Sequence, residues 1–448
     1  MYFLPYLPRR KRNSELFEQA KAYYVGGVHA ANRLHSCLGA PLYLDHVDGC
    51  HLYDADGKVY LDFHTSAGAA LFGYRHPRLM AAAQKALERG NLMNFETEDH
   101  LTLARLMQER IPCAERIRLG NTGTEVTQAA IRLARGYTGR DICIRMEGHF
   151  HGMHELIWYN HNAKAQQEAD GEVVTLPDTA GFPECFRSVV KNVEFNDYDA
   201  LERICEKYAG NVACIIMEPV SYNCGCYAAR KEYLEKVRAL CDRENIVLIF
   251  DEVICGLRMR PGTAQGYFGV TPDLATFAKA IGGTFPLAAL CGKKKVMDAL
   301  APVGKVGMSG TYTGSLMSVL ASTECFRMVA EPGFYDTIDA KADMLYTGIN
   351  DLFRKHGIKG HCRGLGARFG MFFGVEDPEC DYNWRQFTAQ YDAAKNRAFV
   401  TKALEMGMYF VDPGNGPAPC HCGFGIQHTE ADLALALEKM DQIFRTLR

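Results

Sequence analysis

The sequence predicts an α/β fold built on a mostly parallel central sheet. From about residue 114, short apolar runs rich in β-branched residues alternate with segments whose apolar positions recur every three or four residues. Buried strands that are separated by crossover helices form parallel sheets. Ligands of such sheets bind beyond the carboxyl ends of the strands, so the residues that follow each run are the first candidates for a site.

Each element follows from its own run of residues. A hairpin is expected over 50–62, where two alternating strands flank a turn that contains Gly57. After about residue 330 the pattern indicates helices and a few strands, and Thr429 to Asp432 is typical of a capped helix start before 433–447. The strands of the central sheet are expected at 116–119, 142–145, 212–217, 246–250, 274–277 and 287–291, with helices such as 233–240 between them.

Three segments are therefore expected. Residues 1–75 form an N-terminal segment with the hairpin, residues 76–332 form a large domain, and residues 333–448 form a C-terminal small domain. The two terminal segments are expected to build one smaller α+β domain.

Composition excludes several classes of protein. The 448 residues are 48% apolar and 23% charged with a net charge of −3, which gives no electrostatic case for nucleic acid or an anionic membrane. No apolar stretch approaches the roughly 18 to 20 residues of a membrane helix, and the basic cluster 9–12 is expected to be a solvated terminal segment. A cytoplasmic location is expected.

The seventeen cysteines indicate reduced thiols, because many lie in apolar runs, such as Cys214. The closer sets Cys224-Gly225-Cys226 and Cys420-His421-Cys422 lack the paired C-x₂-C spacing of a zinc site. No metal is expected.

Lys279 and Asp251 are the strongest candidates for chemistry. Lys279 follows Asp251 by 28 residues, and each closes an apolar run. A lysine amine and a buried carboxylate, both brought to one cleft by strand ends, are the groups that pyridoxal phosphate chemistry requires. The amine forms a Schiff base with the cofactor aldehyde, and the carboxylate, expected to stay ionised, keeps the pyridine nitrogen protonated. The alternatives are a solvated lysine and an aspartate that caps the next segment.

Two further motifs suit the same cofactor. Thr122, Gly123 and Thr124 follow one expected strand and open a helix, where free N–H groups and the positive helix end favour a phosphate; the alternative is a plain N-cap by Thr122 or Thr124. Phe150 follows the next strand and is a candidate to stack on the pyridine ring, with a core phenylalanine as the alternative.

Together these motifs resemble the class III pyridoxal-phosphate-dependent aminotransferases, most closely the glutamate-1-semialdehyde 2,1-aminomutase-like branch. The similarity runs from about Gly26 to the C-terminus. The matching segments are 26–28 with Arg33, 121–125, 134–140, 148–152, 218–220 with Asn223, 248–256, 266–274, Lys279, and Gly310-Thr311.

The resemblance implies fold type I architecture and bound pyridoxal 5′-phosphate. It also implies a homodimer with shared active sites, in which residues 1–75 contribute to the interface and Thr311 reaches the phosphate in the other subunit. Val253 would pack on the ring face opposite Phe150, and Glu218 and Asn223 would lie at the phenolic side of the cofactor. The residues placed at the cofactor are Thr122, Gly123, Thr124, Phe150, His151, Glu218, Asn223, Asp251, Val253, Lys279 and Thr311.

The departures from the family pattern concern the substrate. Arg33 matches the arginine with which the aminomutase holds a substrate carboxylate, but Ala67 stands in place of its tryptophan and Cys420 in place of a glutamate. A C-terminal arginine that many class III members use is absent, because no arginine lies between Arg397 and Arg445. Arg33, Ala67, Phe150 and Cys420 are the candidate substrate contacts.

The favoured function is an aminotransferase that moves an amino group from an amine or amino acid to a keto acid or aldehyde, with Lys279 as general acid and base. A glutamate-1-semialdehyde-type aminomutase, which transfers the group within one molecule, is the first alternative. A non-catalytic pyridoxal-phosphate-binding protein is a more distant one.

Overall fold

A seven-stranded sheet is the centre of the structure, a computed structural model that describes residues 11–162, 166–376, 383–414 and 416–447. Its strand order is β4-β12-β11-β10-β7-β5-β6, and every neighbouring pair is parallel except the two that β12 makes with β11 and β4. The strands are β4 (Arg116–Gly120), β5 (Ile142–Met146), β6 (Val190–Val193), β7 (Val212–Met217), β10 (Val247–Asp251), β11 (Leu274–Phe277) and β12 (Ala288–Gly292).

The α/β fold expected from the sequence is confirmed. Six of the strands lie at the expected runs, while β6 was not anticipated because Lys191 and Asn192 interrupt its apolar pattern. β6 lies at the edge of the sheet, where it pairs with β5 and its Asn192 forms an isolated antiparallel bridge with Val173.

Helices cover both faces of this sheet because successive side chains of a strand point to opposite faces. On β10, Ile249 packs in the apolar cluster of α5 (Gly123–Thr138), whereas Leu248 and Phe250 pack in the cluster of α6 (Tyr198–Lys207) and α7 (Lys231–Glu244). Such strands are buried on both sides, which explains their continuous apolar sequences.

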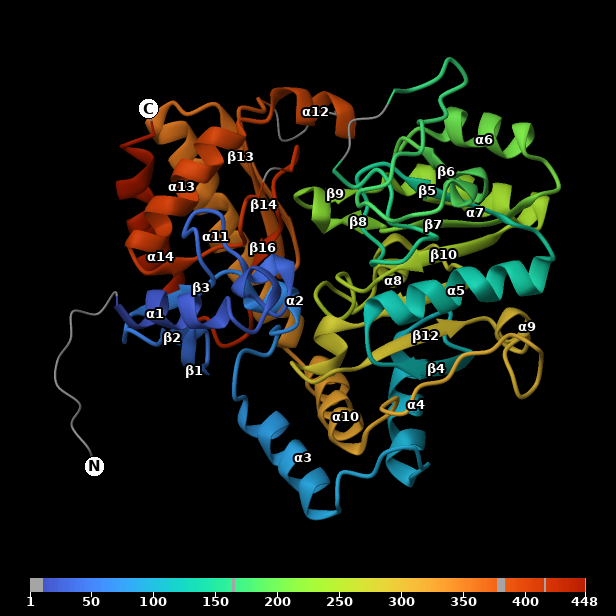
Figure 1. Cartoon of the computed structure of the whole chain (residues 1–448), viewed down its shortest axis with the longest axis horizontal. Helices are drawn as coiled ribbons and strands as arrows, with labels where there is room; N and C mark the ends of the chain where they lie inside the picture. Colours follow the sequence, from blue (N-terminus) through green and yellow to red (C-terminus); the bar gives the residue numbers. More distant parts are fainter. Residues whose placement is uncertain (1–10, 163–165, 377–382, 415, 448) are drawn as a thin grey trace.

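Segments from the two ends of the chain meet in a smaller α+β unit. Figure 1 shows the blue N-terminal strands beside the red C-terminal helices, across from the central sheet. The contact is direct, since β15 (Met408–Tyr409) pairs in parallel with β3 (Val59–Asp62), the last strand of the hairpin. A three-stranded sheet of β13 (Gly360–Leu365), β14 (Arg368–Phe373) and β16 (Cys422–Gly423) completes the unit with α11 (Phe334–His356), α13 (Ala393–Glu405) and α14 (Glu430–Phe444).

The hairpin and the C-terminal helix match their expected chemistry. β2 (His51–Asp54) and β3 flank the turn, and Thr429 caps α14 by accepting a hydrogen bond from the Asp432 backbone while the Asp432 carboxylate accepts from Thr429 N at 2.8 Å. In a separate group of helices, α3 (Pro77–Glu88) and α4 (Glu98–Arg110) pack against α10 (Leu316–Ala330). The segment boundaries 1–75, 76–332 and 333–448 stay predictions.

The remaining elements are short or peripheral. In the described ranges, none of the helices has the length and apolar character needed to cross a bilayer. Residues 9 and 10 of the basic cluster lie outside the described ranges. The other elements are α1 (Lys11–Ala20), η1 (Val25–Gly27), η2 (Ala31–Arg33), β1 (Leu44–Asp48), α2 (Thr65–Gly68), η3 (Glu184–Val189), β8 (Val220–Ser221), η4 (Tyr222–Cys224), β9 (Tyr227–Ala228), α8 (Ala264–Phe268), η5 (Lys279–Gly282), α9 (Lys294–Met297), β13 (Gly360–Leu365), β14 (Arg368–Phe373), α12 (Trp384–Gln390) and β16 (Cys422–Gly423).

Candidate active site

The candidate site lies at the carboxyl ends of the parallel strands. Asp251 is the last residue of β10, Glu218 follows β7 directly, and Lys279 lies two residues beyond β11. His151 lies on the loop that follows β5. Because these strands are parallel, their carboxyl ends share one edge of the sheet and bring these side chains into one region.

Asp251 is buried, and both of its carboxylate oxygens accept hydrogen bonds. Its side chain is 3% exposed. His151 Nδ1 lies 2.7 Å from Oδ2, while Val253 N and Thr276 Oγ1 donate to Oδ1 at 3.0 and 3.2 Å. Three donors from three loops or strands fix the orientation of this carboxylate.

Lys279 has a strained backbone and an amine without a partner. Its φ is 52°, in the left-handed region that a residue with a side chain rarely adopts, and such strain concentrates at functional sites. Its amine forms no hydrogen bond or ion pair with any described residue. Burial, with the nearby charges of Arg258 and Arg368, lowers its pKa to about 7. The amine is therefore available as a nucleophile and as a proton carrier near neutral pH.

Glu218 connects two of the predicted cofactor residues. Its Oε1 accepts a hydrogen bond from Phe150 N at 2.9 Å, and Asn223 Nδ2 donates to both carboxylate oxygens at 3.0 Å. Burial and the neighbouring charge of Asp251 raise the pKa of Glu218 to about 8. Glu218 can therefore carry a proton close to the site at neutral pH.

The start of α5 has the form expected of an anion site. Thr122 caps the helix by accepting from Glu125 N at 3.2 Å, so the plain N-cap is present, while Gly123 N and Thr124 N make no hydrogen bond with a described residue. Gly123 and Val253 are close neighbours, because a Cβ on Gly123 would lie 3.1 Å from Val253 Cγ1. Free N–H groups at a helix N-terminus suit a phosphate.

Two predicted cofactor residues have surroundings that leave their roles open. The Phe150 ring is half-buried and lies 5.2 Å from the ring of His161 and 6.4 Å from that of Trp158, between centroids. Thr311 is exposed, forms no hydrogen bond with a described residue, and lines a cavity of about 820 Å³ with residues of α4 and β4. Stacking by Phe150 and the intersubunit role of Thr311 stay predictions.

The predicted substrate residues come from both terminal segments. Arg33 is exposed on η2. Burial lowers the pKa of His64 and raises the pKa of Tyr409, and the charge of Arg33 adds to the first shift and opposes the second. Ala67 is half-buried on α2 with a φ of 53°. Cys420 is half-buried and its Sγ lies 3.4 Å from the backbone oxygen of Asp412.

Sequence reasoning missed four residues around Lys279, namely Arg258, Arg368, His64 and His421. The charges of Arg258, Arg368 and Lys279 all lower the pKa of His421, which burial holds well below its usual range. The available signals were weak. Arg258 lies just past the motif 248–256, Arg368 is a charged residue in the otherwise uncharged strand β14, and His421 was considered only as part of a cysteine motif.

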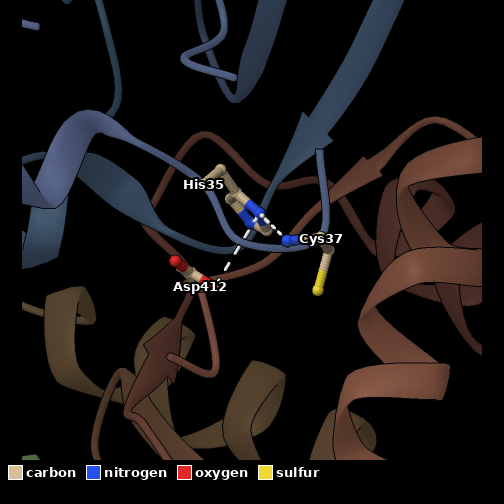
Figure 2. Close-up of side chains that lie close together, drawn as sticks. All are labelled: His35, Cys37 and Asp412. Atoms are coloured by element: carbon tan, nitrogen blue, oxygen red, sulfur yellow. Dashed lines mark hydrogen bonds and ion pairs between the residues drawn. The ribbon is translucent and has the colours of Figure 1, made fainter. Parts of the chain in front are cut away.

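Within the described ranges, two groups of side chains lie close enough to hold a metal ion, and neither contains the cysteines of 224–226 or 420–422. Figure 2 shows the imidazole of His35 beside the backbone nitrogen of Cys37 and the carboxylate of Asp412, while the sulfur of Cys37 points away from the ring. These contacts attach the segment that follows Arg33 to the loop after β15. The two groups are His35, Cys37 and Asp412, and Cys50, His51 and Asp432.

The comparisons with known proteins agree with this geometry. Residues 36–444 match the model of the aminotransferase class-III family, and the chain belongs to that family. An ω-transaminase from Sphaerobacter thermophilus is 28% identical, with 98% of each chain covered and a TM-score of 0.89. A glutamate-1-semialdehyde aminomutase from Pseudomonas aeruginosa PAO1 is 21% identical over 98% of this chain and 95% of that one, with a TM-score of 0.85. The FumI protein of Sphingopyxis sp. MTA144, in its pyridoxal phosphate internal aldimine form, is 24% identical over 97% and 96%, with a TM-score of 0.83.

Class III aminotransferases are enzymes that depend on pyridoxal 5′-phosphate, so the expected family, fold type and cofactor are confirmed. The residues present fit that cofactor. Lys279 offers a buried amine and α5 offers N–H groups at its start, both without a partner among the described residues, and Asp251 offers an oriented carboxylate.

Proposed function

We propose that this class III aminotransferase transfers an amino group between two molecules, from an amine or amino acid to a keto acid or aldehyde. The observation that carries the proposal is the partnerless amine of Lys279, placed at the same sheet edge as the buried, hydrogen-bonded carboxylate of Asp251. When bound, pyridoxal phosphate supplies an aldehyde that combines with amines and a ring that accepts electrons from the substrate carbon.

Each residue then has a defined task. Lys279 Nζ holds the cofactor at rest and, once released, moves a proton from the substrate Cα; its pKa of about 7 suits both directions of that transfer. Asp251 would keep the pyridine nitrogen of the bound cofactor protonated. The carboxylate oxygens of Asp251 are held in place by hydrogen bonds from His151, Val253 and Thr276. Glu218 and Asn223 form a hydrogen-bonded pair that positions the loop of Phe150 through its backbone N–H.

The substrate and the assembly complete the proposal. Arg33 is assigned to a substrate carboxylate, since a guanidinium grips that group with two parallel hydrogen bonds. The protein is assigned to a homodimer in which Thr311 serves the phosphate site of the other subunit; the exposure of Thr311 beside an open cavity supports this role. A cytoplasmic location is supported by the free state of every cysteine in the described ranges.

The test is a donor screen on the purified holoenzyme. Loss of the absorption band of the lysine-bound cofactor and release of a ketone or aldehyde in amounts equal to the donor consumed are expected. Lys279→Ala should abolish both signals, whereas Lys295→Ala, which removes an exposed lysine, should abolish neither. Retention of the band in Lys279→Ala would assign the attachment to another lysine.

The same screen separates the aminomutase alternative. An aminomutase returns an isomer of the amine that it receives and needs no second substrate. Release of product that depends on an added acceptor therefore supports the transferase, and isomerised amine formed without an acceptor contradicts it.

A further inference from the structure

Arg258 and Arg368 are two buried arginines that have no acidic partner. Both side chains are 0% exposed, and neither forms an ion pair with a described residue. Arg258 donates to the backbone oxygens of Ile254 and Gly68, which leaves its Nη1 without a hydrogen-bond partner in the described ranges. A buried charge without an opposite charge beside it destabilises the folded protein by an amount on the order of several kcal/mol.

The second arginine is held by neutral groups only. Arg368 Nη1 donates to Thr65 Oγ1 at 2.6 Å, and Nη2 donates to the backbone oxygen of His421 at 2.9 Å and to its Nδ1. Its Nε has no partner in the described ranges. Burial lowers the pKa of Arg368 to about 10, which leaves the guanidinium charged at neutral pH.

A nearby carboxylate does not compensate these charges. Asp62 favours the charge of Arg368 electrostatically, but its oxygens accept hydrogen bonds from His64 N, Thr65 N and Tyr74 Oη at 2.8, 3.0 and 2.7 Å. Within the described ranges, Asp62 forms no hydrogen bond or ion pair with Arg368. The positive charge therefore stays available for a ligand.

Two histidines add N–H donors beside these charges. An arginine can only donate, so His421 Nδ1 accepts from Arg368 Nη2 and the ring carries its proton on Nε2, which bonds to no described residue. His64 Nδ1 accepts from Ala67 N at 3.3 Å, so its proton also lies on Nε2. Burial, with the charge of Arg368, lowers the pKa of His64 to about 3, and the ring stays neutral.

The backbone that holds this group is strained. Thr65, Ser66 and Ala67 have φ values of 50°, 49° and 53°, and each left-handed residue costs about 1–3 kcal/mol. This backbone places Thr65 Oγ1 against Arg368, and the following Gly68 O accepts from Arg258. Strain that orients two buried cations beside Lys279 points to a binding role for this segment.

We propose that Arg258, Arg368, His64 and His421, hereafter the arginine cluster, receive the carboxylate of an amino acid donor or keto acid acceptor, and that Arg368 selects for it. The inference rests on the proposed function, because the charges of Arg258 and Arg368 act on the Lys279 amine on which transfer depends. Arg368, on β14, thus contributes a substrate carboxylate contact in addition to the one assigned to Arg33. Substrates that carry a carboxylate are therefore the preferred class.

The main experiment compares matched substrates in the holoenzyme. The first half of the reaction is followed through cofactor absorbance with phenylalanine against 2-phenylethylamine, and with 4-aminobutanoate against butylamine. In Arg368→Met, kcat/KM for the carboxylate-bearing member should fall at least about tenfold, and that for the simple amine less than about threefold. Arg354→Met, which removes an exposed surface charge, should change neither value.

Binding gives an independent readout. Acetate and succinate should perturb the cofactor absorbance, and Arg368→Met should weaken both about tenfold, while Arg368→Lys retains the charge and gives an intermediate loss. If the Arg368→Met variant does not fold, the His421→Leu variant is measured in its place. His421→Leu removes the Nε2 donor and should weaken the carboxylates several-fold, and His421→Gln, which keeps an N–H donor, should restore part of the loss.

Each outcome decides the inference. Equal losses with carboxylates and simple amines would show that Arg368 acts on Lys279 or on the fold alone, and an unchanged preference with unchanged succinate binding would show that the cluster binds no substrate. If the wild-type protein transfers no amino group from any of the four donors, the proposed function fails for that panel. Acetate and succinate binding then still decides whether the arginine cluster holds a carboxylate.

Discussion

His151 and Asp251 form a buried pair in which Nδ1 lies 2.7 Å from Oδ2, although 100 residues separate them in the chain. An ionised carboxylate can only accept a hydrogen bond. In this contact Nδ1 of His151 therefore carries the proton, and Nε2 carries none. That nitrogen is buried without a partner in the described ranges. His151 therefore acts as a donor that orients Asp251.

Replacing His151 should impair turnover more than cofactor retention. His151→Leu leaves the buried Oδ2 without its donor, at a cost of about 1–3 kcal/mol, so kcat should fall roughly tenfold to a hundredfold. His151→Asn places an amide N–H near the position of Nδ1 and should recover part of the activity. Steady-state kinetics and cofactor content of the purified variants test this, and equal activity of the two variants would contradict the orienting role.

Asp251→Asn should separate binding from chemistry. The amide keeps the size of the side chain but removes the charge that we propose faces the protonated pyridine nitrogen. We expect the variant to retain cofactor and to lose at least about a hundredfold in kcat, in line with ~2.7 kcal/mol for a lost charge interaction. Single-turnover measurements of cofactor absorbance give the rate, and near-normal turnover would refute the assignment.

The reactivity of Lys279 should follow a pKa near 7. Burial and the charges of Arg258 and Arg368 disfavour the ammonium form, so the amine loses its proton near pH 7 instead of near 10.5. The rate at which the cofactor-free protein combines with added pyridoxal phosphate should rise between pH 6 and 8 and then level off. Arg368→Met should move the midpoint upward, because one cation is removed. A rate that still rises above pH 9 in the wild-type protein would contradict the shift.

Arg385 should stabilise the protein in a pH-dependent way. Its guanidinium lies 2.8 and 2.9 Å from the carboxylate oxygens of buried Glu147, whose pKa burial raises to about 7 although Arg385 opposes the shift. Arg385→Met should reduce the free energy of unfolding by about 2 to 3 kcal/mol, below the value for fully buried pairs because Arg385 is 27% exposed.

The sign of this pH effect follows from the raised pKa. The folded protein binds a proton at Glu147 more tightly than the unfolded chain does, so stability is lost as pH rises from about 4.3 through the folded-state pKa. The cost of Arg385→Met should therefore be larger at pH 9 than at pH 6. Thermal unfolding at both pH values measures it, and the double variant Glu147→Gln, Arg385→Met should lose the pH dependence. An equal loss in the free energy of unfolding at both pH values would contradict the prediction that the ionised Glu147 carboxylate lacks a counter-charge in the variant.

Thr311 should act across subunits. In a mixed dimer of Lys279→Ala and Thr311→Ala subunits, one of the two sites combines a native Lys279 with a native Thr311 from the other chain. Each single-variant protein alone should be inactive. Each mixed dimer should recover up to about half of the activity of a wild-type dimer, because one of its two sites is complete. Isolated mixed dimers without recovered activity would place both residues in the same subunit's site.

Much of the site was predictable because its residues follow strands. Asp251, Glu218 and Lys279 end or follow β10, β7 and β11, and continuous apolar runs mark such strands in the sequence. The start of α5 was recognisable for a similar local reason, since small and hydroxyl-bearing residues precede a helical pattern. Those signals extend over a few neighbouring residues and need no knowledge of the fold.

Other contacts depend on residues that only the folded chain brings together. Arg368 lies on β14 and meets Thr65 and His421, which are 303 and 53 residues away in the sequence. The single charge in an otherwise uncharged strand is only a weak local signal, because the burial of Arg368 and the absence of an acidic partner among the described residues arise from the packing of distant segments.

The sequence by itself predicted the strand-end residues and the start of α5, because apolar periodicity and turn chemistry are local properties, and its resemblance to a known family implied the family, the fold type and the cofactor. Only the tertiary structure decided that His151 orients Asp251, that Glu218 and Asn223 hold the Phe150 loop, and that Arg258 and Arg368 are buried beside Lys279. The physical reason is that burial, desolvation and pairing are set by the distant neighbours that folding brings into contact.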